Sequence, residues 1–361
     1  MESFLPNQYH FAHKYSTCLN EYLANLIVFG EQNKVYSVFI NIDNDEHKKE
    51  FSQLSEMKIF NWLENHGYKD ELEKMILMSL YPALLTDLCQ FVAEALSCTE
   101  RARLTVAYAL LRKPFRDNLF YLEWLLAEPK SFINVFYEKT PIEFSLDRML
   151  REDKVRQIVR EAVSLTLKKD SIDPDVIYDM RYNKLTDYSF DVMWNKALHL
   201  VTTAKGHTTE YQNLNLIFSN DEDRLYQWRQ IYTFLPAILD YAVDIAETLM
   251  FIILGKERPG FYIDYFHREL GFAVWSKEMV DWQNSPKLSS EMPNDLDDLH
   301  FACPRCKKVV DMQENLARAL FLDRKMKCPK CSRKISIESI VEQNRIRPHT
   351  DLESIRMHLG I

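Results

Sequence analysis

Residues 303–331, CPRCKKVVDMQENLARALFLDRKMKCPKC, hold two Cys-x-x-Cys pairs that are separated by 21 residues. Zinc prefers four tetrahedral ligands, and two such turns supply four thiolates: Cys303, Cys306, Cys328 and Cys331. With no coordination position left open, the pattern predicts one structural Zn²⁺ ion. A redox or disulfide role of the two pairs is the alternative interpretation.

The residues around the cysteines predict a small zinc-ribbon module with a tail, over residues 300–361. Val309–Val310 and Ile335–Ile337 follow the two pairs as short β-type runs, as a ribbon requires. The spacer is slightly longer than usual, and residues 314–322, ENLARALFL, have a helical pattern. We therefore expect a ribbon that carries an inserted helical turn.

Charge divides the chain at the same place. Residues 301–361 carry 13 Lys and Arg against 7 Asp and Glu, so residues 1–300 hold a net charge of −14 within the total of −8. A basic module on an acidic body is where a polyanion would bind. The candidate nucleic-acid contacts are Arg305, Lys307, Lys308, Lys330, Arg333 and Lys334. The alternative is a solvated face that balances the charge of a zinc–tetrathiolate centre, and the module lacks the aromatic ladder of single-strand binders.

The rest of the chain predicts an all-α fold, a helical bundle body over residues 1–276. Only seven of 361 residues are glycine, whereas nucleotide-binding α/β folds and barrels need glycine for tight turns. Residues 35–42 are the best strand candidate, and the aromatic stretch 255–276, with three glycines, predicts irregular structure. Residues 277–299, acidic with two prolines, predict a linker. The sequence shows no evident internal repeat.

Location follows from the cysteines and the N-terminus. Three further cysteines lie scattered in apolar segments, a pattern that favours a reduced, cytoplasmic protein. The first residues lack the basic start and apolar core of a signal peptide. Residues 75–92 are apolar, but Pro82 and the acidic residues around the run favour a buried core helix over a membrane span.

Two sets of charged residues stand out in the body. Arg112, Arg116 and Glu123 share a helix face within an apolar run, which is either a polar site in the bundle core or a structural ion-pair network. Asp240 and Asp244 lie with Glu247 on one helix face. Di-iron bundles also need Glu-x-x-His pairs, and the sequence has none. These carboxylates are therefore expected to pair with arginines such as Arg112, Arg116 or Arg181, or to face solvent.

Residues 109–124, ALLRKPFRDNLFYLEW, and the layout of residues 182–199 before a long helix resemble HEPN-like bacterial helical proteins over about residues 70–254. The resemblance implies an all-helical, usually dimeric protein, often an RNA-binding or RNA-cleaving component of toxin and antiphage systems. The HEPN ribonuclease signature is Arg, four to six residues, then His. No histidine in this sequence is preceded by Arg at that distance. Arg345 precedes His349, but by only four positions.

These observations predict a cytoplasmic, zinc-binding regulatory or interaction protein of a bacterial defence or toxin-related type. Its basic module would bind nucleic acid or a protein partner, its bundle would form a homodimer, and no membrane would be involved. The competing hypothesis is an HEPN-like ribonuclease effector with a non-standard active site.

Overall fold

The computed structural model describes residues 3–346 except 43, 187, 204–207, 210, 212–213, 216–220 and 280–299. The body consists of helices joined by turns and loops, which confirms the all-α expectation. In chain order they are η1 (Asn7–Tyr9), α1 (His10–Gln32), α2 (Asp45–Ser52), α3 (Glu56–Asn65), α4 (Lys69–Glu100), α5 (Leu104–Arg112), η2 (Lys113–Asn118), α6 (Leu119–Ala127), α7 (Pro129–Glu138), α8 (Leu146–Arg151), α9 (Lys154–Ser164), α10 (Pro174–Tyr182), α11 (Phe190–Leu198), α12 (Asp221–Leu254) and α13 (Phe261–Met279).

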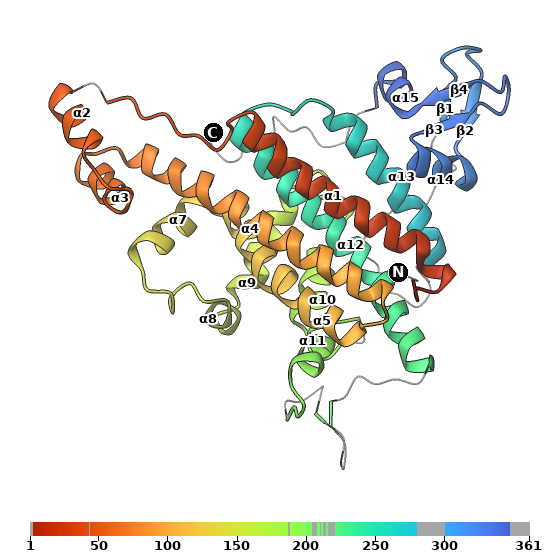
Figure 1. Cartoon of the computed structure of the whole chain (residues 1–361), viewed down its shortest axis with the longest axis horizontal. Coiled ribbons are helices and arrows are strands. Elements are labelled where there is room, and N and C mark those ends of the chain that lie inside the picture. The colour runs from red at the N-terminus through yellow and green to blue at the C-terminus, as the bar shows by residue number, and fades with distance from the viewer. Residues whose placement is uncertain are drawn as a thin grey trace.

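Helix α12 forms the centre of the bundle, and α1 packs along both α12 and the other long helix, α4 (Figure 1). Helix α12 begins with three acidic residues in its first turn, where the helix dipole favours negative charge. From Gln227 to Phe251 nearly every residue of α12 is buried. A helix that is covered on all sides is a core helix, so the other helices are arranged around α12.

Helix α4 is the only helix of the described residues that is long and apolar enough to cross a membrane by length and composition. In the fold it packs against α1, α5, η2 and α6. Leu85, Leu88 and Val92 are fully buried there. One face of α4 thus belongs to the core of the bundle, while 39% of its most apolar stretch is buried in all.

A π-helical turn, η2, which contains Pro114, lies between α5 and α6. A π turn widens the backbone and leaves carbonyl groups without their usual partner. Tyr182 of α10 donates a hydrogen bond to the carbonyl of Arg116 at 2.9 Å. Asn118, which is buried, donates to the carbonyl of Leu84 in α4. The wide turn is therefore fixed by side-chain hydrogen bonds that tie it to two other helices.

Two predictions about secondary structure are wrong. Residues 35–42 form turns and extended chain, and the part of the chain that the structure describes offers them no partner strand. Most of residues 255–276 is helical, since α13 runs from Phe261 to Met279. Its glycines have different roles: Gly255 and Gly260 have positive φ angles at the turn before α13, whereas Gly271 lies inside the helix.

The C-terminal module is built from β1 (His300–Ala302), β2 (Val309–Asp311), α14 (Glu314–Asp323), β3 (Lys325–Lys327), β4 (Lys334–Ser336) and α15 (Ile337–Asn344). The helix expected between the cysteine pairs is confirmed as α14. Strands β1 and β2 pair antiparallel, as do β3 and β4, in two separate sheets. Each sheet is thus a hairpin that is followed by a helix.

The module contains two copies of one structural unit, offset by 25 residues. The prediction that the chain has no internal repeat is therefore wrong. Cys303 corresponds to Cys328 and Cys306 to Cys331, and each unit continues with a second strand and a helix. The buried strand residues correspond as well, Val310 with Ile335. Only the cysteines and the proline after the first of each pair are identical over this segment, which hides the repeat in the sequence.

The module lies at one end of the molecule and packs directly on the body (Figure 1). Helices α14 and α15 contact α13. Phe321 of α14 packs against Tyr15 of α1, with ring centroids 5.6 Å apart, and stacks on His267 of α13. His267 Nε2 also donates to the carbonyl of Phe321 at 2.7 Å. The cores of body and module are therefore continuous. Most of the predicted linker, residues 280–299, lies outside the described residues.

At the opposite end of the molecule, α2 and α3 pack on the first turns of α4 around a second, smaller apolar cluster (Figure 1). Its buried residues are Ile42, Trp62, Leu63, Leu72, Ile76 and Ile133. Ile42 belongs to the predicted strand, so part of that apolar run is used as an anchor for the extended chain.

Candidate functional site

The four predicted metal ligands lie in two turns with the same backbone hydrogen bonds. The N–H of Cys303 donates to the carbonyl of Lys308 at 2.9 Å, and the N–H of Cys328 donates to that of Arg333 at 2.9 Å. In each turn the residue four positions after the first cysteine donates back to the carbonyl of that cysteine. This residue, Lys307 or Ser332, has a positive φ angle of 55° or 58°. The two turns therefore present their sulfur atoms in equivalent ways.

The four sulfur atoms gather in one cluster, all within 4.8 Å of one another. The Sγ atoms of Cys303 and Cys331 are 3.9 Å apart. A zinc–sulfur distance near 2.3 Å requires tetrahedral sulfur–sulfur separations of about 3.8 Å, whereas a disulfide needs about 2.05 Å. All four cysteines are free thiols. The arrangement fits a metal ion held by four thiolates and does not fit disulfides within or between the pairs.

Backbone dipoles prepare one of these thiols for metal binding. Burial raises the pKa of Cys303, but the N–H groups of Cys306 and Arg305 and the neighbouring thiols lower the pKa to about 6. Burial and hydrogen bonds with the other thiols instead raise the pKa of Cys331 to about 11. In the second turn the N–H of Lys330 lies 3.4 Å from the sulfur of Cys328. A metal ion binds the thiolate form, so N–H groups directed at sulfur favour the bound state.

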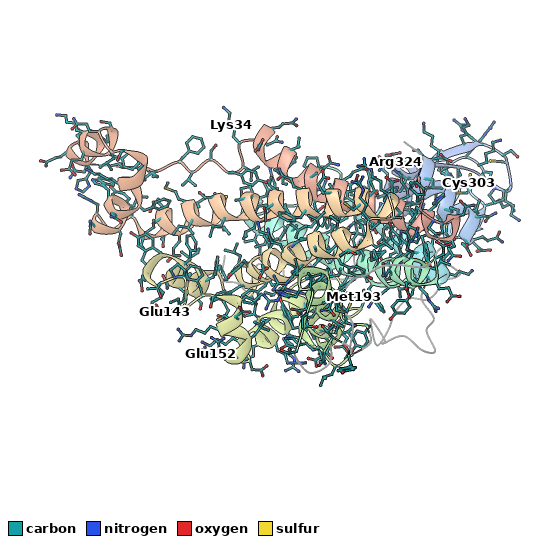
Figure 2. The ribbon with its side chains drawn as sticks, turned by 60° about the horizontal axis from the view of Figure 1, so that its bottom comes forward. Lys34, Glu143, Glu152, Met193, Cys303 and Arg324 are labelled. Carbon is teal, nitrogen blue, oxygen red and sulfur yellow. The ribbon has the colours of Figure 1, made fainter. Side chains whose placement is uncertain are left out.

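The predicted basic contacts surround this cluster on the module surface. The basic side chains that are exposed and have no ion pair with any described residue include Arg305, Lys307, Lys308, Lys327, Lys330, Arg333 and Lys334. By contrast, the two arginines of α14 and its C-terminus are paired: Arg318 with Glu278 and Glu314, and Arg324 with Glu338. Figure 2 shows Cys303 and Arg324 together at this end of the molecule.

Two of the unpaired cations oppose each other directly. In the register of β3 and β4, Lys327 faces Lys334, and both are exposed. Like charges at directly opposite positions destabilise a strand pair. The hairpin thus keeps an unfavourable pair of positive charges on its outer face, and an anion bound there would relieve the repulsion.

The carboxylates of α12 form a buried ion cluster. Arg268 of α13 donates to Asp240 at 3.0 Å and to Asp244 at 2.8 Å. Lys168, in the turn after α9, donates to Asp240 at 2.5 Å and lies 2.7 Å from Glu269. Asp240, Asp244 and Arg268 are at most 3% exposed. The partners are therefore Arg268 and Lys168 rather than the arginines named from the sequence.

Burial and charge act in opposite directions within this cluster. Burial raises the pKa of Asp244 to about 6 against the attraction of Arg268 and Lys168. For Asp240 the same burial is outweighed by Lys168 and Arg268, so the pKa lies below its usual value. One oxygen of Asp244, Oδ2, is buried without a hydrogen-bond partner. Asp244 is therefore the member of the cluster that is least stable as an anion.

The remaining predicted polar residues separate into two places. Glu123 forms a fully buried, bidentate ion pair with Arg181, at 2.5 and 2.8 Å. Arg116 instead pairs with Asp117 and Asp147 near the surface, and Arg112 has its Nε buried without a hydrogen bond. Arg112 and Arg116 thus do not join Glu123 in one site, and the pairing of Glu123 with Arg181 fits the structural-network interpretation.

Glu247, the third carboxylate on α12, pairs with Arg258, which also contacts Asp264 at 2.9 Å. In the described part of the chain, the four cysteines are the only group of three or more His, Cys, Asp or Glu residues gathered closely enough for one metal ion. The sequence did not identify Lys168, Arg258 or Arg268 as partners. Arg268 stands between His267 and Glu269 in the sequence, so no local apolar pattern marked it as buried.

No protein-family model matches the chain, and searches of curated proteins and of solved structures find no match either.

Proposed function

We propose that this chain is a cytoplasmic, zinc-binding regulatory or interaction protein whose C-terminal module binds nucleic acid. The observation that carries the proposal is the group of exposed basic side chains around the four-cysteine cluster, for which the described residues provide no ion pair. If the basic residues only offset the negative charge of the metal site, the two lysines that face each other on the strands, Lys327 and Lys334, would not be needed. Phosphates that replace counterions at such a surface provide binding energy that depends on salt.

Zinc is the proposed ion because four thiolates at tetrahedral spacing are the donor set of structural zinc sites. The cysteines would hold the ion and the ion would hold the two repeat units together. It would supply no open coordination position for a substrate, so its role is structural. The basic residues beside it would offset the negative charge of the tetrathiolate centre and also contact phosphates.

The experiment is a binding titration of labelled nucleic acid by the full, metal-loaded chain at several salt concentrations. The test variant replaces Arg305, Lys307, Lys308, Lys330, Arg333 and Lys334 by Gln. The control variant replaces the exposed lysines of the acidic body at positions 49, 130, 139 and 169 by Gln. We expect the test variant to lose binding and the control to keep it. Equal binding by both variants would refute a nucleic-acid role of the module.

The same protein preparation tests the ribonuclease hypothesis and the predicted homodimer. RNA cleavage that Arg116→Ala abolishes would identify the HEPN-like ribonuclease instead of a binding protein. Such a role would require Arg116 to leave its ion pairs with Asp117 and Asp147. Light scattering at several protein concentrations tests the homodimer that the HEPN resemblance implies. A protein partner of the module would compete with nucleic acid for the same basic surface.

A further inference from the structure

The two repeat units of the module place cations at equivalent positions. Arg305 and Lys330 each follow the proline of their Cys-Pro-x-Cys turn, 25 residues apart. Lys308 and Arg333 are the next equivalent pair, and each accepts, through its carbonyl, the hydrogen bond from the first cysteine of its turn. All four side chains are exposed. Two equivalent pairs of cations therefore lie around one sulfur cluster.

At both positions the charge is kept while the side chain changes between Arg and Lys. Arg contacts a base edge through a planar, bidentate fork, whereas Lys is a single point charge, so exchange between them at such a contact is not conservative. A phosphate accepts either residue, because the interaction depends mainly on charge. A ligand that contacts both repeat units in the same way is therefore recognised by its phosphates rather than by its bases.

Within the described residues, the module also lacks a surface of exposed aromatic side chains on which bases could stack. Within residues 300–346 the aromatic side chains of the Phe, Tyr and Trp type are Phe301 and Phe321, and each is only 3% exposed. Single-strand binders hold bases on exposed aromatic side chains. A duplex keeps its bases stacked inside and presents its phosphates outside, so it needs no such platform.

The helices of both units face the body, since α14 and α15 contact α13. Figure 1 shows the hairpins of both units on the outer side of these helices. From these observations we infer that the module binds duplex nucleic acid through phosphates of both strands, one strand for each repeat unit, without reading the base sequence. This inference rests on the proposed function and names its substrate class.

The test uses the metal-loaded full chain with three probes of equal length: duplex DNA, duplex RNA and one of the single strands. Fluorescence anisotropy over a series of salt concentrations gives Kd and the slope of log K against log salt. We expect both duplexes, or one of them, to bind more tightly than the single strand. The four equivalent cations are neutralised in a variant with Arg305, Lys308, Lys330 and Arg333 changed to Gln. The magnitude of its log K against log salt slope should be smaller by about 3–4, because each phosphate contact that is lost removes nearly one unit of slope.

A second variant exchanges the residues between the units, with Arg305→Lys, Lys308→Arg, Lys330→Arg and Arg333→Lys. It keeps every charge, so we expect an unchanged Kd on duplexes of different sequence. Preferred binding of the single strand, or loss of duplex binding in the exchange variant, would overturn the inference and leave the proposed function intact. Failure of every probe to bind would overturn both. Metal content, measured for each variant, shows whether the module is folded.

Discussion

The buried pair of Glu123 and Arg181 allows a quantitative test of what stabilises the bundle. Both side chains are fully buried. Arg181 donates two hydrogen bonds to Glu123 and one to Tyr182, and Tyr241 of α12 donates to Glu123 at 2.8 Å. Replacing Glu123 by Leu would leave the Arg181 charge inside the core with only the Tyr182 hydroxyl as a partner. Breaking a buried pair in this way costs about 3–5 kcal/mol.

Replacing the whole pair should cost far less than removing one member. In the triple variant Glu123→Leu, Arg181→Met, Tyr241→Phe, no buried charge and no unsatisfied tyrosine hydroxyl remains at this position. Replacement of a buried ion pair by apolar residues of similar size is often close to neutral, so we expect an unfolding free energy within about 2 kcal/mol of the wild type, with allowance for imperfect packing. The single variant should be the less stable of the two.

Urea unfolding followed by tryptophan fluorescence measures these differences. The control is Glu152→Gln, which breaks the exposed pairs with Arg148 and Lys154 and should change the unfolding free energy only slightly. A loss of less than about 1 kcal/mol in Glu123→Leu would refute the argument, since surface pairs typically contribute only that much. A triple variant as unstable as the single variant would also refute it, because the penalty would then come from packing and not from the unpaired charge.

Three further predictions concern the metal, the proton and the contact between body and module. Metal analysis should find about one zinc ion per chain, and Cys328→Ser should lose it and make the module sensitive to protease. The raised pKa of Asp244, about 6, means that the folded state holds a proton on Asp244 at pH values where the unfolded chain does not, so stability should fall as pH rises from about 4 to 6, by up to about 3 kcal/mol. Asp244→Asn should remove that part of the pH dependence, and identical pH profiles of variant and wild type in urea unfolding would contradict the assignment. In Gly271→Ala the new Cβ would lie 2.6 Å from the rings of Tyr15 and Phe321, so limited proteolysis should release the module faster, at a cost of about 1–3 kcal/mol of packing energy.

The helices and the metal ligands are the parts of this molecule that local sequence predicts well. Helical periodicity and low glycine content predict the long helices, and the Cys-x-x-Cys spacing predicts the sulfur cluster, because these signals lie within one element or one turn. The failed prediction at 255–276 shows the limit of composition. Gly271 is accommodated in a helix because Tyr15 and Phe321 approach it closely, and neither residue is near it in the sequence.

Partner choice in the core is the second limit. Spacing on α12 correctly placed Asp240 and Asp244 on one face, but their cations, Lys168 and Arg268, come from segments on either side in the chain. The predicted strand at 35–42 failed for a related reason. Its residues have the composition of a strand, yet the described chain offers no second strand to pair with, and Phe39 is left 85% exposed. Both the ion-pair partners of the α12 carboxylates and the partner strand of residues 35–42 depend on which distant segments come together in the whole fold.

The packing of Phe321 on Tyr15 has a consequence for biosynthesis. The first helix of the chain, α1, packs on α12 and α13 and on a ring that follows Tyr15 by 306 residues. At about 5–20 residues per second, a ribosome needs roughly 15–60 s to make the intervening chain. During the first part of that time, until α12 and α13 have been made, the face of α1 that these two helices cover has no partner, and α1 packs only on α4. A nascent chain of this protein should therefore be a client of ribosome-associated chaperones, and its N-terminal helix should be the segment they bind longest.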